Sequence, residues 1–237
     1  MLDHPVTIKT YSQIIKPSQN ARQHGVKFAT HPNTLVTVEK SCTMKIISKD
    51  THFDNVWYDF VDSNGKVYNE SVMVLFEANN EAIINIRPPQ ASRYTLKLHA
   101  TLCGENTTLA EYIIDCKSVE ADYQSYPKNR GFYGPKPDFI ERGFVNSGVR
   151  AFCTCKNGNF VLTLKTTSVP LVLIKMEDYD ETYSEAYYMV EQDNGSITIK
   201  ARLIKKGYYK LTLFSKVGES SYTVAYTFLI HNIQEAE

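Results

Sequence analysis

The chain has 237 residues and no formal net charge, since 26 basic residues balance 26 acidic ones. This balance argues against binding to nucleic acid or to an anionic membrane surface through net positive charge. Apolar runs reach only about five residues, far below the roughly 20 that a spanning helix needs. An odd count of five cysteines is typical of thiols in a reducing compartment. Residues 1–10 also lack the apolar core of a secretory signal, and the sequence therefore predicts a cytoplasmic protein.

The N-terminal part shows a helical period. The apolar residues that lie three or four positions apart there are Ile8, Tyr11, Ile14 and Ile15. Thr7 is suited to cap the start of this helix, and Pro17 ends it. The pattern predicts a short helix or leader within residues 1–20, with the helix over 6–16.

After Pro17 the pattern changes to the alternation that is typical of β-strands. In the first half, strands are predicted over 35–39, 44–48, 56–61, 72–76, 83–87, 94–98 and 110–116. In the second half, they are predicted over 149–155, 160–165, 171–176, 185–190, 197–203, 208–214 and 223–230. Asn157-Gly158 is the strongest hairpin signal, because both residues tolerate the positive φ of a type I′ turn.

The two halves are copies of one unit. The residues that recur 115 positions later are Ile84, Arg87, Tyr94, Leu96 and Leu98, which correspond to Ile199, Arg202, Tyr209, Leu211 and Leu213. Duplication predicts two domains, each large enough for its own core, over residues 21–117 and 144–237. A linker over 118–143 separates them. A repeated scaffold also argues against an enzyme, because a single catalytic site needs only one copy of its scaffold.

Each copy has features of an immunoglobulin-like fold. Tyr94 and Tyr209 each lie two residues before an inward leucine, as in a tyrosine corner. Those leucines, Leu96 and Leu211, stand where antibody domains have cysteine, which predicts sheets held by apolar packing alone. The fold class predicted is therefore all-β, with two tandem immunoglobulin-like antiparallel β-sandwiches and a short N-terminal helix. In the core of strand C we expect Trp57 in the first copy, and Leu173 or Ile174 in the second.

The linker contains an aromatic and proline-rich stretch. Phe132, Tyr133 and Pro135 are its candidate interaction residues. Two interpretations are open: the rings bind a partner, or they pack the loop against a domain. The second is the more common role of aromatic side chains.

No residues form a convincing catalytic, cofactor or metal site. A nucleophilic cysteine needs a nearby base and a lowered pKa. All five cysteines fall in or beside predicted strands, and only His24, His31 and His52 could approach one of them, Cys42 or Cys103. The Cys153 and Cys155 pair lacks further ligands, so core packing is expected. The acidic run over 177–181 is expected to be a solvated loop, because its spacing does not match a calcium loop.

Several short motifs resemble one family. They are the segments 5–11, 24–32, 201–203, 207–211 and 228–230, together with Tyr133-Gly134-Pro135. These motifs resemble the region that follows the transglutaminase-like domain in proteins of the kyphoscoliosis peptidase and hillarin family. That family usually has Trp-Gly-Pro where this chain has Tyr133-Gly134-Pro135. The resemblance implies paired immunoglobulin-like domains and cytoskeletal or muscle-associated partners, filamin-like proteins among them. It also implies an upstream catalytic core of Cys, His and Asp or Asn, to which no position of this chain corresponds.

Three functions from different classes follow. The leading hypothesis is a non-catalytic protein-interaction or structural module of the cytoskeleton, which offers exposed sheet edges and loops. The alternative is an accessory C-terminal region of a thiol protease or transglutaminase-like enzyme. A third is an extracellular adhesion protein that uses the three N-x-S/T sequons at Asn69, Asn106 and Asn194.

Overall fold

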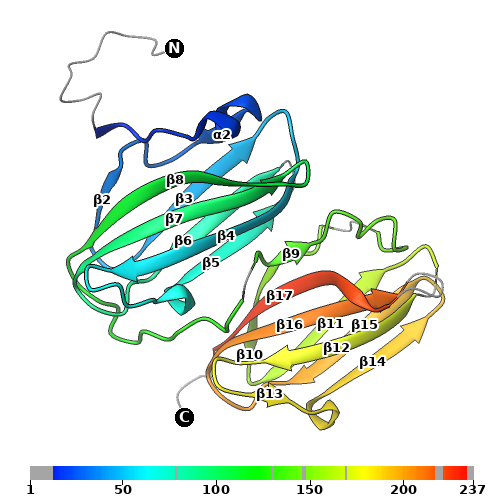
Figure 1. Cartoon of the computed structure of the whole chain (residues 1–237). Helices are drawn as coiled ribbons and strands as arrows, with labels where there is room; N and C mark the ends of the chain where they lie inside the picture. Colours follow the sequence, from blue (N-terminus) through cyan, green and yellow to red (C-terminus); the bar gives the residue numbers. More distant parts are fainter. Residues whose placement is uncertain are drawn as a thin grey trace. The chain divides into compact units, whose positions relative to one another are not determined.

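A computed structural model of the chain describes residues 13–77, 80–129, 131–145, 148–168, 170–216 and 221–233. The chain is mostly β-structure and forms two compact units (Figure 1). The first unit comprises Met1–Val74 and Ala78–Tyr123, and the second comprises Leu75–Glu77 and Gln124–Glu237. In the described part, no helix has the length and hydrophobicity to cross a membrane.

The first unit is a sandwich of two four-stranded sheets. One sheet has the order β1-β3-β6-β5 and the other β2-β8-β7-β4. β2 is parallel to β8, whereas the pairs β1–β3, β3–β6, β4–β7 and β7–β8 are antiparallel. The strands are β1 (Val26–Phe28), β2 (Leu35–Val38), β3 (Cys42–Ser48), β4 (Phe53–Asp62), β5 (Val72–Glu77), β6 (Glu81–Ile86), β7 (Arg93–Leu102) and β8 (Glu105–Cys116), with the 3₁₀ helix η1 (Asn69–Ser71) before β5. This is the predicted immunoglobulin-like arrangement.

A short α-helix, α2 (Gln19–Gln23), lies near the N-terminus. The Ser18 hydroxyl caps it by accepting a hydrogen bond from the Ala21 amide at 3.1 Å. Most of the helix predicted over 6–16 lies outside the described residues. In the described end of that range, Gln13 is helical and Ile14 forms an antiparallel bridge to Asn33.

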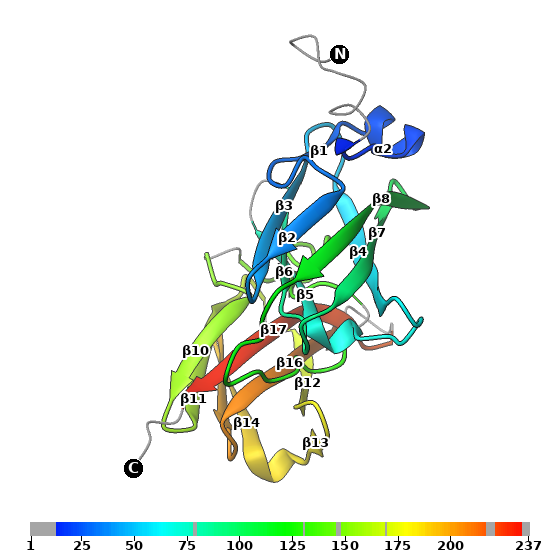
Figure 2. The ribbon, with the colours of Figure 1, turned by 90° about the vertical axis from the view of Figure 1, so that its left-hand side faces the viewer.

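The second unit repeats the sandwich. One sheet has the order β10-β17-β16-β12-β13, with β9 also paired to β17, and the other is the three-stranded sheet β11-β15-β14. The strands are β9 (Gly134–Pro135), β10 (Phe152–Lys156), β11 (Asn159–Lys165), β12 (Leu171–Glu177), β13 (Thr182–Tyr183), β14 (Tyr188–Asp193), β15 (Ser196–Arg202), β16 (Gly207–Lys216) and β17 (Thr223–Ile233), with the 3₁₀ helix η2 (Glu185–Tyr187) before β14. β10 runs parallel to β17, as β2 does to β8 in the first unit (Figure 2).

The duplication extends to strand register. In the first unit Phe60 lies opposite Leu96, and in the second Met176 lies opposite Leu211. All four side chains are almost completely buried. The recurring inward leucines thus fix the same pairing of strands in both copies, because a slip by one residue would turn every core side chain outward.

The prediction for strand C was correct in the second copy and wrong in the first. Ile174 is buried in β12, whereas Leu173 is exposed. Trp57 is not in the core either: it lies opposite His99 on the outer face of β4, and the two rings stack at 5.6 Å. Side chains alternate along a strand, so the inward position belongs to its neighbour Tyr58.

The turn predicted at Asn157-Gly158 exists, but it does not close a hairpin. Both residues have positive φ, 59° and 70°, as a type I′ turn requires. The strands on either side, however, belong to different sheets, because β10 pairs with β17 and β11 pairs with β15. The Asn157-Gly158 dipeptide determined the turn, whereas long-range strand pairing determined the sheet to which each strand belongs.

Candidate interaction surface

The aromatic residues of the linker are buried. Phe132 and Tyr133 are each 1% exposed. The Phe132 ring packs on Phe76 at 4.0 Å, and the Tyr133 hydroxyl donates a hydrogen bond to the Pro127 carbonyl at 3.2 Å. Pro135 lies opposite Tyr226 of β17 and is partly exposed. This geometry favours the loop-packing interpretation, and a binding role for the three residues stays a prediction.

Both tyrosines proposed for tyrosine corners are buried and bonded to the backbone. The Tyr94 hydroxyl donates to the Gln90 carbonyl at 3.0 Å, and the Tyr209 hydroxyl donates to the Lys205 carbonyl at 3.0 Å. Tyr209 also accepts the Lys205 amide at 2.7 Å. Burial raises the pKa of Tyr94 to about 12, although the bond to Gln90 opposes the shift. Each hydroxyl therefore satisfies backbone groups of the loop that precedes its strand.

Four of the five thiols lack the environment of a nucleophile. Burial raises the pKa of Cys42 to about 12, and it also raises the pKa of Cys116, Cys153 and Cys155. A raised pKa keeps the thiol protonated, which is the reverse of activation. His24 contacts the Thr51 hydroxyl at 3.1 Å. Within the described ranges, no group of three or more His, Cys, Asp or Glu side chains could hold a metal ion.

We expect these environments to separate the cysteines by reactivity. At about pH 8, iodoacetamide should alkylate the exposed Cys103 in the folded protein, and modify Cys42 and the buried Cys116 only after unfolding. Peptide mass spectrometry over a time course measures the three rates. Alkylation of Cys42 as fast as that of Cys103 would contradict the assignment.

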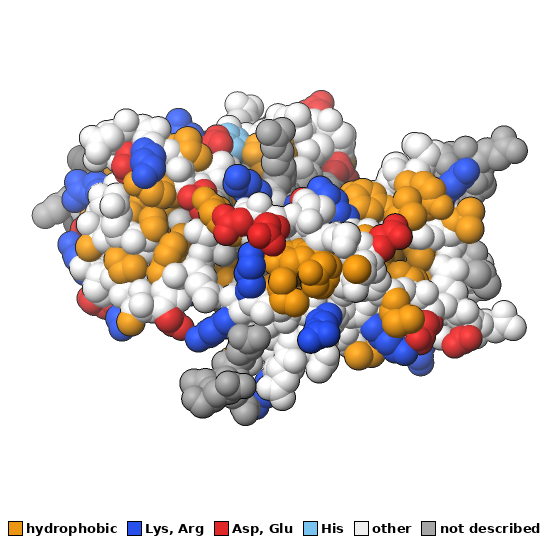
Figure 3. Space-filling view, turned by 90° about the horizontal axis from the view of Figure 1, so that it is seen from below, with side chains coloured by type: hydrophobic (Ala, Val, Ile, Leu, Met, Phe, Trp, Pro, Cys, Tyr) orange, Lys and Arg blue, Asp and Glu red, His pale blue; other side chains and the backbone are white. Residues whose placement is uncertain are grey.

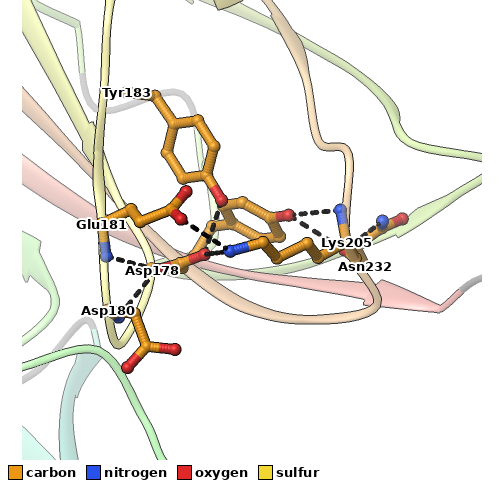
Figure 4. A network of polar contacts seen from close by, with 7 residues as sticks. Asp178, Asp180, Glu181, Tyr183, Lys205 and Asn232 are labelled. Carbon is orange, nitrogen blue, oxygen red and sulfur yellow. Dashed lines mark hydrogen bonds and ion pairs between the residues drawn. The ribbon is translucent and has the colours of Figure 1, made fainter.

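The acidic run is a largely exposed loop, as predicted, and it also carries an ordered polar cluster. Asp178 Oδ1 accepts the Asp180 and Glu181 amides at 2.8 and 2.7 Å, and Asp178 Oδ2 accepts the Tyr183 hydroxyl at 2.5 Å. Lys205 lies between Asp178 and Glu181, with Nζ to carboxylate distances of 3.5 and 3.2 Å. Figure 4 shows these side chains pointing toward one another. Their groups satisfy one another, so the cluster serves the stability of the second unit.

Exposed apolar side chains are concentrated in the second unit. Twelve large hydrophobic residues in the described part are exposed; two of them, Leu35 and Val67, belong to the first unit, which leaves ten for the second. Figure 3 shows one face of the molecule, where hydrophobic side chains gather between charged ones. A soluble monomer seldom exposes large apolar patches, and those that occur often mark interaction sites.

One group of these residues lies on the outer face of β12 and β16. Leu171 and Leu173 of β12 are 56% and 49% exposed, and Leu173 lies directly opposite Phe214 of β16. Lys175 follows on the same face, beside Glu177 at 2.7 Å. We call Leu171, Leu173 and Phe214 the β12 face. Sequence reasoning missed this face because a strand that is apolar on both of its faces is typical of a fully buried strand.

The corresponding face of the first unit is polar. The residue at the position of Leu173 is Trp57, and the one at the position of Phe214 is His99. His99 Nδ1 is 3.1 Å from the Thr108 hydroxyl, and His99 Nε2 is 3.3 Å from Asp59 Oδ2. The two copies therefore share a core and register but differ in the chemistry of this face.

The edge of β12 is already occupied along most of its length. The Tyr188 hydroxyl donates to the Ile174 carbonyl at 2.9 Å, and the side-chain amide of Gln192 donates to the Pro170 carbonyl at 3.0 Å. β13 pairs with Met176 and Glu177 at the end of the strand. Such contacts block the addition of another strand. It is therefore the face of β12, rather than its edge, that is available.

One family model and a set of solved structures are similar to this chain. Residues 10–127 match the family model of the KY-like, immunoglobulin-like domain. No curated protein matches the chain. Among solved structures, it is similar to the titin domains Z1Z2 in complex with telethonin, with 16% identity, coverage of 89% of this chain and 98% of that one, and a TM-score of 0.27. It is also similar to the N-terminal Ig1-2 module of the Drosophila receptor protein tyrosine phosphatase DLAR, with 12% identity, coverage of 89% and 100%, and a TM-score of 0.24.

Proposed function

We propose that the chain, which matches the KY-like, immunoglobulin-like domain over residues 10–127, is a non-catalytic protein-interaction module of the cytoplasm, associated with the cytoskeleton. The observation that carries the proposal is the β12 face, an apolar surface on a rigid sheet. Aromatic and aliphatic side chains on such a surface can anchor a partner. The cytoskeletal identity of the partner rests on the family resemblance.

The chemistry of the β12 face indicates the kind of partner. Leu171, Leu173 and Phe214 offer apolar contact, and Lys216, which ends β16 opposite Leu171, adds positive charge. Lys175 on the same face is paired with Glu177. A complementary partner presents an apolar patch with carboxylates at its rim. The raised thiol pKa values support the non-catalytic part of the proposal.

We expect lysine substitutions on the β12 face to abolish capture of the partner. The wild-type chain should retain a protein from a cytoskeletal extract, and the L171K/L173K variant should bind that protein, once purified, at least about tenfold more weakly. The matched control is Leu35→Lys, because Leu35 is about as exposed but lies in the first unit. Equal loss with L35K, or no loss with L171K/L173K, would refute the assignment of the surface.

The family match also favours a second function, that of an accessory region of a thiol protease or transglutaminase-like enzyme. In that case the module positions substrates for a catalytic core carried elsewhere in the same polypeptide. Sequencing the transcript on the 5′ side of the Met1 codon distinguishes the two. An in-frame segment that encodes a Cys, His and Asp core supports the accessory function, and an in-frame stop codon supports the independent module.

A further inference from the structure

The chain contains three Asn-Gly dipeptides, and the structure places them in different environments. They are Asn64-Gly65, Asn157-Gly158 and Asn194-Gly195, and all three asparagines are exposed. Asparagine is a thermolabile residue, because the backbone nitrogen of the residue that follows it can attack its side-chain carbonyl carbon. A glycine at the following position favours this attack, since it has no Cβ and the widest choice of backbone conformations. The state of each glycine amide therefore decides which asparagine reacts.

Two of the three glycine amides are engaged in hydrogen bonds. The Gly65 amide donates to the Asp62 carbonyl at 3.1 Å. The Gly158 amide donates to Asn232 Oδ1 at 3.2 Å, and both Gly158 and Asn232 are buried. Before such a nitrogen can attack, its hydrogen bond has to break and the turn has to open locally. The asparagines that precede these two glycines are therefore protected in the folded protein.

The third glycine amide differs from the other two. Asn194 and Gly195 form the turn between β14 and β15, which closes on the pair Asp193 and Ser196. Gly195 is exposed, with a φ of 89°, and no described residue accepts a hydrogen bond from its amide. Its carbonyl accepts the Thr166 amide at 2.9 Å, so the turn is anchored without use of the Gly195 nitrogen. This nitrogen can therefore react while the hairpin stays folded.

We propose that Asn194 is a site of spontaneous deamidation in the folded protein. The Gly195 nitrogen loses its proton to solvent and bonds to the side-chain carbonyl carbon of Asn194. The bond from that carbon to the side-chain nitrogen breaks, and the nitrogen takes up a proton and leaves as ammonia. Water then opens the resulting cyclic succinimide, at one carbonyl to give aspartate and at the other to give isoaspartate. No oxidant or reductant is involved, and water is the co-reactant.

Both products change the turn between β14 and β15. Each adds a carboxylate next to Asp193 in the sequence, to a chain that has no formal net charge. Isoaspartate also places one more carbon atom in the main chain of a turn whose length fixes the register of the two strands. Deamidation therefore adds a charge to this hairpin of the second unit. In the isoaspartyl form it also weakens the pairing of Asp193 with Ser196.

The test compares the folded with the unfolded chain. The purified wild-type protein is incubated at mildly alkaline pH, and peptide mass spectrometry measures the rate of deamidation at each asparagine. In the folded protein Asn194 should react at least about tenfold faster than Asn64 and Asn157, because those two require local opening. In denaturant the three rates should become similar, since each asparagine precedes glycine. Isoelectric focusing should show an acidic species that accumulates at the rate measured for Asn194.

The matched variants are Asn194→Gln and Asn64→Gln, both in exposed turns. Glutamine reacts far more slowly, because its longer side chain has to close a larger ring. N194Q should lose the acidic species, and N64Q should keep it. A rate at Asn194 no faster than that at Asn64 or Asn157 in the folded protein, or an acidic species that persists in N194Q, would overturn the proposal. The L171K/L173K variant should deamidate at the wild-type rate, which separates failure of this inference from failure of the proposed function.

Discussion

Replacement of Leu211 by alanine is expected to lower the free energy of unfolding of the second unit by about 3 kcal/mol. Leu211 is completely buried in β16, opposite Met176 on one side and Phe228 on the other. No disulfide joins the sheets at this position, which is the one that cysteine occupies in antibody domains. Packing of this leucine thus holds the sheets together where a disulfide does so in antibody domains. Its truncation leaves a cavity between the two sheets.

Urea unfolding followed by tyrosine fluorescence and circular dichroism measures this loss. The control is Leu173→Ala in the neighbouring strand, which removes the same atoms from an exposed side chain and should change the free energy of unfolding by less than about 0.5 kcal/mol. Leu96→Ala should reproduce the large loss in the first unit, because the duplication places Leu96 in the same register. Similar effects for L211A and L173A would contradict the assignment of the core.

Replacement of Asp178 by alanine is expected to destabilise the second unit by about 2 kcal/mol, the usual effect of removing a charged hydrogen-bond acceptor. Two backbone amides and the Tyr183 hydroxyl lose their acceptor, and Lys205 loses a carboxylate. Asp178→Asn is the matched control, because its amide oxygen can still accept the two backbone amides. We expect D178N to lose about half as much as D178A, and thermal unfolding distinguishes the two variants.

The same cluster predicts how stability depends on pH. Burial on its own raises the pKa of Asp178, but the hydrogen bonds from Tyr183, Glu181 and Asp180 and the charge of Lys205 outweigh it, so the pKa is lowered overall. A carboxyl whose pKa is lower in the folded state stabilises the fold above its unfolded pKa, near 3.9, and loses this contribution as the pH falls through the folded value. The second unit should therefore unfold more readily below about pH 4. D178N should show a shallower loss over this range, and an identical acid profile for both proteins would refute the role of Asp178.

The sequence predicted the fold class because apolar residues recur at regular intervals along it. Alternating apolar residues identified the strands, and the recurrence of Tyr94, Leu96 and Leu98 at Tyr209, Leu211 and Leu213 identified the repeated core. It failed at Trp57 because periodicity locates a strand more securely than it decides which of its two faces is buried. Composition suggested that a tryptophan belongs inside, whereas pairing with His99 places it outside.

The candidate surface was harder to predict for the same reason. Leu171 and Leu173 have the composition of buried residues, and only the pairing of β12 with β16 shows that they point outward. The Asp178 cluster was also missed, because its partner Tyr183 lies in β13 and its partner Lys205 lies in the loop before β16. Spacing along the chain detects local turns, as at Asn157-Gly158, but does not detect contacts that the fold creates.

The shared register of the two units has a practical consequence for protein engineering. Because Trp57 and His99 occupy the positions of Leu173 and Phe214 over equivalent buried strands, the outward residues of one copy can be transplanted onto the other while every inward side chain is left unchanged. A chimera of this kind carries two identical faces on one polypeptide. The two copies thus offer a natural pair of interchangeable scaffolds.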